Sequence, residues 1–160
     1  MDRILQILGE NSSLTCKEIA AMLGEPEDYI EKQISQYEKE GVIKGYKAVI
    51  DYEKVKGAGT TAYIELTVTP EKDTGFEQIA KQIMDFEEVD SVYLMAGSYD
   101  LLVCVKGESV TEIAMFVARK LSTINAVVAT NTRFKLKTYK ESGIKFCDDE
   151  DDADKRSIIL

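Results

Sequence analysis

The chain opens with two short stretches whose apolar residues recur at helical spacing. Residues 3–11 and residues 15–23 each place apolar side chains along one stripe of a helix. The first stripe consists of Ile4, Leu5 and Leu8, and the second of Ile19, Met22 and Leu23. Thr15 followed by Glu18 is a capping box, in which each side chain satisfies the other's unpaired backbone N–H. The pattern therefore predicts two short amphipathic helices, the second with a defined start.

A third helix is predicted between Pro26 and Gly41. A proline fits the first turn of a helix, and a glycine just past the last turn can adopt the left-handed conformation that ends it. Gly24 ends the second helix in the same way, so only a tight turn separates the second helix from the third. Residues 42–51, VIKGYKAVID, then alternate like a β-strand. This order of elements is typical of a winged helix-turn-helix, with a generic small helical domain as the alternative.

The rest of the chain follows a βαββαβ pattern, after a polar, glycine-containing connection. The predicted strands are residues 61–69, 89–97, 99–107 and 126–139, and the predicted helices are residues 75–86 and 109–124. This order predicts an α+β, ferredoxin-like domain with two helices on one face of a four-stranded sheet. The other sheet face needs cover, most simply from another subunit. The expected domains are residues 1–50 and 61–140, with a linker at 51–60 and an acidic, disordered tail at 141–160.

Acidic residues outnumber basic ones, and they are concentrated near the C-terminus. The formal net charge is -9 at pH 7, and residues 148–154 read DDEDDAD, so two thirds of that charge lies in one run. A protein that coats nucleic acid indiscriminately needs the opposite sign, because phosphate contacts require Lys and Arg. The remaining chain has room for a local basic face. The run is expected to be solvated, and a second hypothesis is that it competes with DNA for that basic face.

Several classes of protein are disfavoured by what the chain lacks. It has no histidine, the commonest general base and a frequent metal ligand, so an enzyme would have to work with carboxylates, Lys, Tyr or Cys. With no clustered acids in the predicted sheet and a helix-turn-helix attached, we expect no enzyme, no metal and no cofactor, and a small-molecule enzyme or ligand-binding module is the alternative. No run of roughly 20 apolar residues is present to span a bilayer. Without an export signal or a CxxC pair, Cys16, Cys104 and Cys147 are expected to be reduced thiols in a cytoplasmic protein. Cys104 is expected in the core, and Cys16 near a helix cap, with redox sensing by Cys16 as the alternative.

A polar interruption, Gly97-Ser98-Tyr99-Asp100, separates two of the apolar strands. Gly97 permits a positive φ or a close backbone approach, and Asp100 places a carboxylate beside a strand that otherwise favours burial. One interpretation is a hairpin turn whose aspartate caps backbone N–H groups. The other is a cradle for a small ligand, in which backbone amides bind a carboxylate and Asp100 binds an ammonium group. The residues by themselves favour the turn.

Two stretches of the sequence resemble the leucine-responsive regulator/AsnC family of feast/famine transcriptional regulators. Residues 16–51, CKEIAAMLGEPEDYIEKQISQYEKEGVIKGYKAVID, are similar to the helix-turn-helix of that family and its closing strand. Residues 92–107, VYLMAGSYDLLVCVKG, are similar to its Gly-x-Tyr-Asp loop in the C-terminal effector-binding and oligomerisation domain. The resemblance extends over roughly residues 3 to 140, with both motifs in the expected order.

The resemblance implies a regulator that binds double-stranded DNA as a homo-oligomer, a dimer that assembles into tetramers or octamers. It also implies an amino acid or related small molecule bound between subunits near the Gly-x-Tyr-Asp loop, which makes the ligand cradle the favoured interpretation. The residues carried over are Met95, Gly97, Ser98, Tyr99 and Asp100, with Thr130 and Thr132 completing the pocket from a neighbouring chain. An effector that binds one assembly state more tightly than another would shift the oligomeric state, and with it the DNA affinity.

The third helix is the expected DNA-reading helix, although it is rich in acidic residues. On a helical wheel, Ile30, Ile34 and Tyr37 form a buried stripe, and the acids gather on one flank or at the N-terminus, where the helix dipole favours them. The candidate DNA contacts are Asp28, Tyr29, Lys32, Gln33, Ser35, Gln36 and Lys39. The family commonly carries arginines where this chain has Lys32 and Gln33, so base recognition is expected to differ or to be weaker. The alternative is a corepressor whose helix-turn-helix does not bind DNA directly.

Overall fold

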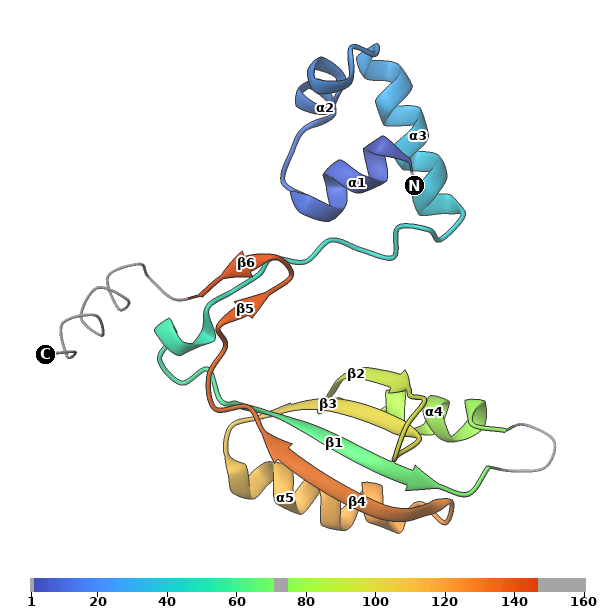
Figure 1. Ribbon diagram of the computed structural model, residues 1–160, viewed down its shortest axis with the longest axis vertical. Coiled ribbons are helices and arrows are strands. Elements are labelled where there is room, and N and C mark those ends of the chain that lie inside the picture. The colour runs from blue at the N-terminus through green and yellow to red at the C-terminus, as the bar shows by residue number, and fades with distance from the viewer. Residues whose placement is uncertain (1, 71–74, 147–160) are drawn as a thin grey trace, which may run out of the picture. The chain divides into compact units, whose positions relative to one another are not determined.

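The computed structural model describes residues 2–70 and 75–146, which divide into two compact units (Figure 1). Residues 2–50 together with 139–146 belong to the first unit, and residues 51–70 and 75–138 belong to the second. The acidic run 148–154 and Cys147 lie outside the described residues, and with them the hypotheses about the tail.

The first unit is built around three helices that meet in a small apolar core. They are α1 (Arg3–Glu10), α2 (Cys16–Leu23) and α3 (Glu27–Lys39). The core consists of Ile4, Ile19, Ala20 and Ile30. The predicted capping box is confirmed, since the Thr15 N–H donates to the Glu18 carboxylate at 2.8 Å and the Glu18 N–H donates to Thr15 Oγ1 at 3.3 Å. Gly24 ends α2 with a φ of 71°, which makes the tight turn into α3.

Two expectations for the first unit are corrected by the structure. Met22 was expected on the buried stripe of α2 but is 60% exposed, because the side of α2 that packs into the core is centred on Ile19 and Ala20. The predicted strand at 42–51 does not form: residues 44–51 have no regular secondary structure. Alternating side chains are not sufficient for a strand, since its N–H and C=O groups need a paired strand beside them.

A short hairpin replaces the start of the predicted disordered tail. β5 (Lys140–Glu141) pairs antiparallel with β6 (Ile144–Lys145), although residues 141–160 were expected to lack structure. The two turn residues, Ser142 and Gly143, have φ values of 48° and 83°. Positive φ at both central positions is the geometry of the two-residue turn that matches the twist of a hairpin.

The second unit contains a four-stranded antiparallel sheet with its helices on one face (Figure 1). Its strands are β1 (Thr60–Val68), β2 (Val89–Leu94), β3 (Leu101–Gly107) and β4 (Val127–Phe134), and its helices are α4 (Glu77–Met84) and α5 (Val110–Arg119). The strand order β2-β3-β1-β4, with two crossover helices, confirms the predicted ferredoxin-like fold. One core joins both helices to the sheet, through Ile64, Leu66, Val103, Ile83 and Phe116 among others.

The segment expected to be a linker, residues 51–60, belongs to the second unit. It contains a 3-10 helix, η1 (Tyr52–Lys54). The Lys106 ammonium lies 5.5 Å from the centre of the Tyr52 ring, and the Glu53 carboxylate accepts a hydrogen bond from the Thr138 N–H at 3.0 Å. These contacts hold the segment against the sheet, so it is ordered and not a free connection.

The sheet face away from the helices is polar and aromatic, and we call it the open sheet face. Strand alternation places Tyr63, Glu65, Tyr93 and Leu102 on it, opposite the buried residues of the same strands. Tyr63 is 37% exposed and Tyr93 is 53% exposed. Neither α4 nor α5 covers this face, and the 3-10 helix η1 contacts it only through Tyr52 and Lys106 in the described residues.

Candidate DNA-binding surface and effector loop

The outward surface of α3 brings four of the predicted DNA-contacting residues together. Lys32, Ser35, Gln36 and Lys39 line a shallow depression on the helix, joined by Glu31. Asp28 and Tyr29 are exposed near the start of α3, whereas Gln33 is half-buried. The buried stripe is as predicted, with Ile30 fully buried and Ile34 and Tyr37 partly buried. The depression offers two ammonium groups, a hydroxyl and an amide, the groups that contact phosphates and base edges, together with the Glu31 carboxylate, which would repel phosphate.

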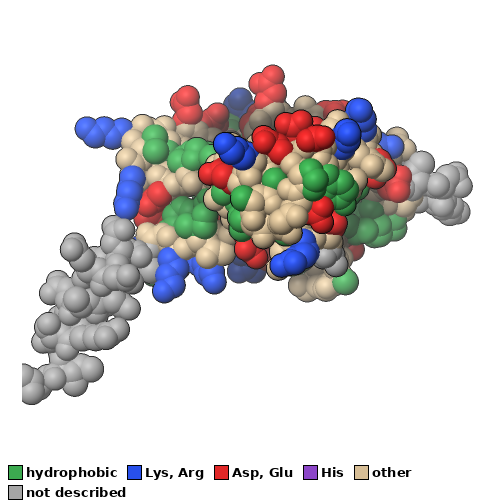
Figure 2. Space-filling view, turned by 90° about the horizontal axis from the view of Figure 1, so that it is seen from above, with side chains coloured by type: hydrophobic (Ala, Val, Ile, Leu, Met, Phe, Trp, Pro, Cys, Tyr) green, Lys and Arg blue, Asp and Glu red, His purple; other side chains and the backbone are tan. Residues whose placement is uncertain are grey.

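Two acids near the C-terminus of α3 are engaged by neighbouring side chains. The Gln36 amide donates to the Glu40 carboxylate at 2.7 Å, and the Tyr46 hydroxyl donates to Glu38 at 3.0 Å. Burial and then the bond to Glu38 raise the pKa of Tyr46. Figure 2 shows Lys and Arg interspersed with Asp and Glu over the visible face, with no large patch of one sign. The surface is therefore mixed in charge, and its positive groups on α3 are Lys32 and Lys39.

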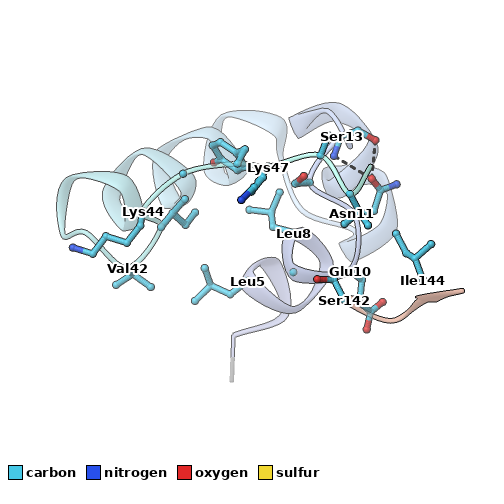
Figure 3. A pocket seen from close by; sticks show the side chains of 17 residues that line it. Leu5, Leu8, Glu10, Asn11, Ser13, Val42, Lys44, Lys47, Ser142 and Ile144 are labelled. Carbon is cyan, nitrogen blue, oxygen red and sulfur yellow. Dashed lines mark hydrogen bonds between the residues drawn. The ribbon is translucent and has the colours of Figure 1, made fainter. Parts of the chain in front are cut away.

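A separate cavity of about 510 Å³ lies within the first unit (Figure 3). Its wall combines side chains of α1, of the extended segment after α3, and of the hairpin β5–β6, including Leu5, Leu8, Val42, Lys44, Ser142 and Ile144. The Ser13 hydroxyl and N–H both donate to the Asn11 side chain at its rim. None of the predicted DNA-contacting or effector residues lines this cavity.

The Gly97–Asp100 loop closes the hairpin between β2 and β3, and we call it the effector loop. The Met95 N–H donates to the Asp100 carbonyl at 2.8 Å, and the Asp100 N–H donates to the Leu66 carbonyl at 2.9 Å. Gly97 does not have a positive φ, and no atom lies within 4 Å of the place where a Cβ would be. The two expected reasons for a glycine here, a left-handed backbone and a close backbone approach, therefore do not apply within this chain. Met95, Gly97 and Ser98 are exposed, and Tyr99 and Asp100 are half-buried.

Asp100 holds the effector loop to the end of β1. Its Oδ2 accepts a hydrogen bond from the Val68 N–H at 2.9 Å. The register between β1 and β4 shifts between Thr67 and Val68, so the aspartate satisfies a backbone donor where the ladder is irregular. This geometry supports a structural role for Asp100 in the turn, and Oδ1 of Asp100 accepts no hydrogen bond from residues 2–70 or 75–146.

Thr130 and Thr132 lie on β4 and face the helix-covered side of the sheet. Thr130 is paired with Leu66 and Thr132 with Ile64, and both threonines are half-buried. Leu66 also pairs with Leu101, directly after the effector loop. Thr130 is therefore aligned across β1 with Leu101, the first residue of β3. Thr132 lies two residues further along β4, away from the effector loop.

An ion-pair network on the open sheet face was not anticipated from the sequence. Arg133 donates to both oxygens of Glu65, from Nε at 2.8 Å and from Nη2 at 3.3 Å, and Asn131 Nδ2 donates to Glu65 at 2.8 Å. The bond from Arg133 is the main cause that lowers the pKa of Glu65, and the same bond raises the pKa of Arg133. The contact depends on the register of β1 against β4, in which Glu65 pairs with Asn131 and Arg133 follows on the same side of β4, and the sequence does not reveal that register.

The described parts of the chain contain neither a membrane-spanning helix nor a cluster of metal ligands. In residues 2–70 and 75–146, no helix has both the length and the apolar character needed to cross a membrane. Over the same ranges, no group of three or more His, Cys, Asp or Glu side chains is arranged to hold a metal ion. Cys104 is buried, as expected, and Cys16 is half-buried against the core of the first unit.

Comparison with known proteins matches each half of the chain to a known domain. Residues 61–144 match the Lrp/AsnC ligand binding domain, and residues 3–44 match a winged helix-turn-helix DNA-binding domain. The chain is 46% identical over 157 residues to YugG of Bacillus subtilis, an uncharacterized HTH-type transcriptional regulator, covering 98% of this chain and 93% of that protein. It is 31% identical over 139 residues to the uncharacterized HTH-type transcriptional regulator PH1916 of Pyrococcus horikoshii, covering 87% and 92% respectively.

Solved structures give the same result. The transcriptional regulator NMB0573 of Neisseria meningitidis, in complex with L-Met, is 26% identical with a TM-score of 0.70, covering 88% of this chain and 93% of that chain. The leucine response regulatory protein LrpA of Mycobacterium tuberculosis is 25% identical with a TM-score of 0.72, covering 89% and 97%. The chain thus belongs to the Lrp/AsnC family of DNA-binding transcriptional regulators, which carry a winged helix-turn-helix and a ligand-binding domain.

Proposed function

We propose that this regulator recognises double-stranded DNA through the outward surface of α3, and that an amino acid controls its DNA affinity by changing its self-association. The observation that carries the DNA part is the depression that Lys32, Ser35, Gln36 and Lys39 line together with one acid, Glu31. Lysines at this surface contact phosphates, while the amide and hydroxyl can reach base edges. Asp28, Tyr29 and Gln33 lie at the margins of the same helix and complete the proposed contact set.

The proposed effector is an amino acid or a closely related molecule. Two findings support it: the match of residues 61–144 to the Lrp/AsnC ligand binding domain, and the similarity to the Neisseria regulator whose structure contains L-Met. The proposed site is the exposed effector loop with Met95. Thr130 and Thr132 are left out of it, because they face the helix-covered side of the sheet, opposite to the open sheet face. The second oxygen of Asp100 would take the ammonium group, and the loop amides would take the carboxylate.

Self-association through the open sheet face is the third part of the proposal. Tyr63, Tyr93 and Leu102 give this face large side chains that are partly or fully accessible, and aromatic residues are enriched in interfaces. A dimer formed this way would place two DNA-binding units in one molecule, and tetramers or octamers would add more. Several weakly binding units on one assembly raise the apparent DNA affinity through effective concentration.

Fluorescence anisotropy on a labelled fragment of the regulator's own promoter, across a salt series, tests DNA binding directly. A steep fall of affinity with salt is expected, because phosphate contacts release counterions. Binding that is absent or independent of salt would contradict the proposal. It would favour a corepressor that acts through a protein partner, an alternative that the mixed charge around α3 keeps open.

Calorimetry with L-Met and a panel of other amino acids tests the effector, with sedimentation velocity run on the same samples. The proposal predicts a binding heat for at least one apolar or polar amino acid and a shift in the sedimentation profile on binding. An effector that binds but changes neither the sedimentation profile nor the DNA footprint would contradict the coupling, since a ligand shifts an equilibrium only by its differential affinity.

A further inference from the structure

The network of Glu65, Asn131 and Arg133 lies on the open sheet face, on the edge strand β4 and its neighbour β1. Both oxygens of Glu65 are engaged, by three hydrogen bonds of 2.8 to 3.3 Å from Arg133 and Asn131. The Glu65 side chain is only 19% exposed, whereas that of Arg133 is 65% exposed. The negative charge is therefore already covered from within the chain, while the guanidinium still faces outward.

Charges on a surface that becomes an interface are costly unless each one has a partner after water has left. An ion pair with good geometry and satisfied hydrogen bonds can be buried at tolerable cost, but one partner left alone is strongly destabilising. The Glu65 network meets this condition before any association takes place. Arg133 binds Glu65 side-on through Nε and Nη2, which leaves its remaining N–H groups for acceptors across an interface.

We propose that the Glu65 network is the specificity element of self-association, a proposal that rests on the pairing of open sheet faces proposed above. It admits a second copy of this chain, whose face carries the same internally neutralised pair, and rejects a face with an uncompensated charge at this position. The occupant is a second copy because the face is complementary to itself: it presents aromatic side chains around a pair with no net charge. In a two-fold interface the same patch meets itself, so each copy contributes an identical neutral pair.

Rejection of other partners follows from the same geometry. One kind of related chain would place a positive charge opposite Arg133 of this chain, and another would carry an arginine at position 133 without an acid at position 65. In either case a charge would be buried in the interface without a partner. Like-charge juxtaposition at an interface costs enough to suppress the wrong partner, which is how natural interfaces separate similar chains. The sheet face would thereby keep this regulator from mixing with relatives of the same fold.

Charge reversal on the full chain tests the proposal, with dimer dissociation constants measured by sedimentation. Glu65→Arg alone gives a face with two positive charges, and Arg133→Glu alone gives a face with two negative charges. Each single variant is expected to lose homodimer affinity by about tenfold or more, because like charges then meet across the two-fold axis. An equimolar mixture of the two single variants should form a heterodimer, and the double variant E65R/R133E should recover the homodimer to within about threefold of the parent.

A matched control separates this effect from a general effect of charge or folding. Lys120→Glu reverses a charge in the ion pair with Glu88, outside the Glu65 network, and should leave the dissociation constant unchanged. Single variants that dimerise as well as the parent would overturn the proposal. A mixture of the two single variants that dimerises no more tightly than either variant alone would also overturn it, and so would a double variant that does not regain the dimer affinity of the parent. The double variant also covers poor folding of a single variant, because it is measured separately. A parent chain that is monomeric would instead refute the proposed self-association itself.

Discussion

The carboxylate of Asp100 accepts a hydrogen bond from the backbone N–H of Val68 at 2.9 Å, which ties the effector loop to the end of β1. A substitution at Asp100 therefore acts on the fold as well as on any ligand. Asp100→Ala leaves the Val68 N–H without its acceptor, at a cost of about 1–3 kcal/mol in unfolding free energy. Asp100→Asn keeps a side-chain oxygen for that N–H but removes the charge.

Asp100→Asn is therefore the informative variant for effector binding. We expect it to retain the melting temperature and the sedimentation profile of the parent in the absence of ligand. It should lose most of its affinity for an amino acid, because a neutral amide binds an ammonium group more weakly than a carboxylate does. Calorimetry on both variants checks this, and an Asn variant that binds the amino acid as tightly as the parent would remove Asp100 from the ligand site.

The double variant Lys32→Ala/Lys39→Ala should weaken binding to every DNA sequence. Each phosphate contact contributes roughly 0.9 to the slope of log K against log salt, so the slope should fall in magnitude by about 1.8. Anisotropy titrations at several salt concentrations measure it. Lys56→Ala/Lys81→Ala removes the same charge from residues of the second unit and serves as the control. An equal loss in the control would mean that the effect comes from net charge and not from α3.

The sequence was sufficient to predict the elements whose signals are local. The capping box at Thr15 and Glu18 and the glycine stop at position 24 depend on neighbours within a few residues, and both are present in the structure. The strand order of the second unit also followed from the alternation of patterns, because few topologies connect two βαβ units in a compact way. Local chemistry and a small set of allowed connections account for these successes.

The failures concern features that depend on a partner elsewhere. Residues 42–51 alternate like a strand, yet a strand forms only where another strand can pair with it. The hairpin at 140–145 was missed because Ser142-Gly143 is a weaker turn signal than Asn-Gly, and three of its four strand residues are charged. The contact between Glu65 and Arg133 requires the register of β1 against β4, which no pattern within either strand reveals.

Gln36 should contribute to the choice of sequence more than to overall affinity. Its amide is the group on α3 best suited to a base edge, and a bidentate amide contact to adenine is worth about 1–3 kcal/mol of discrimination. Gln36→Ala should thus reduce the preference for the cognate site and leave non-specific binding nearly unchanged. Glu40→Ala removes the acceptor that holds the Gln36 amide at 2.7 Å, and it should raise DNA affinity. Competition with unrelated DNA measures both, and equal losses on both DNAs for Gln36→Ala would exclude base recognition.

Thr15→Ala should destabilise the first unit through its helix α2. The Thr15 hydroxyl oxygen accepts from the Glu18 N–H, and loss of such a cap costs about 0.5–2 kcal/mol. Thermal denaturation followed by far-UV circular dichroism should show a lower melting temperature. Thr15→Ser keeps the hydroxyl and should retain most of the stability, so a serine variant as unstable as the alanine variant would show that the methyl group, and not the cap, is responsible.

Arg133→Met should raise the pKa of Glu65 toward the ordinary glutamate value of 4.5, because the hydrogen bond from Arg133 is the largest cause of its lowering. A carboxylate whose folded-state pKa lies below its unfolded value stabilises the fold above that unfolded value. Its contribution is lost as the pH falls below 4.5 and passes through the lowered folded-state pKa. The parent should therefore lose this contribution to the unfolding free energy only in acid, whereas the variant has little of it to lose.

Side-chain carboxyl carbon shifts in an NMR titration report the pKa of each glutamate. Glu88, whose pKa is lowered mainly by Lys120, provides the internal control in the same spectra. If the pKa of Glu65 differed between the parent and Arg133→Met by no more than the pKa of Glu88 does, Arg133 would not be the partner of Glu65 in solution.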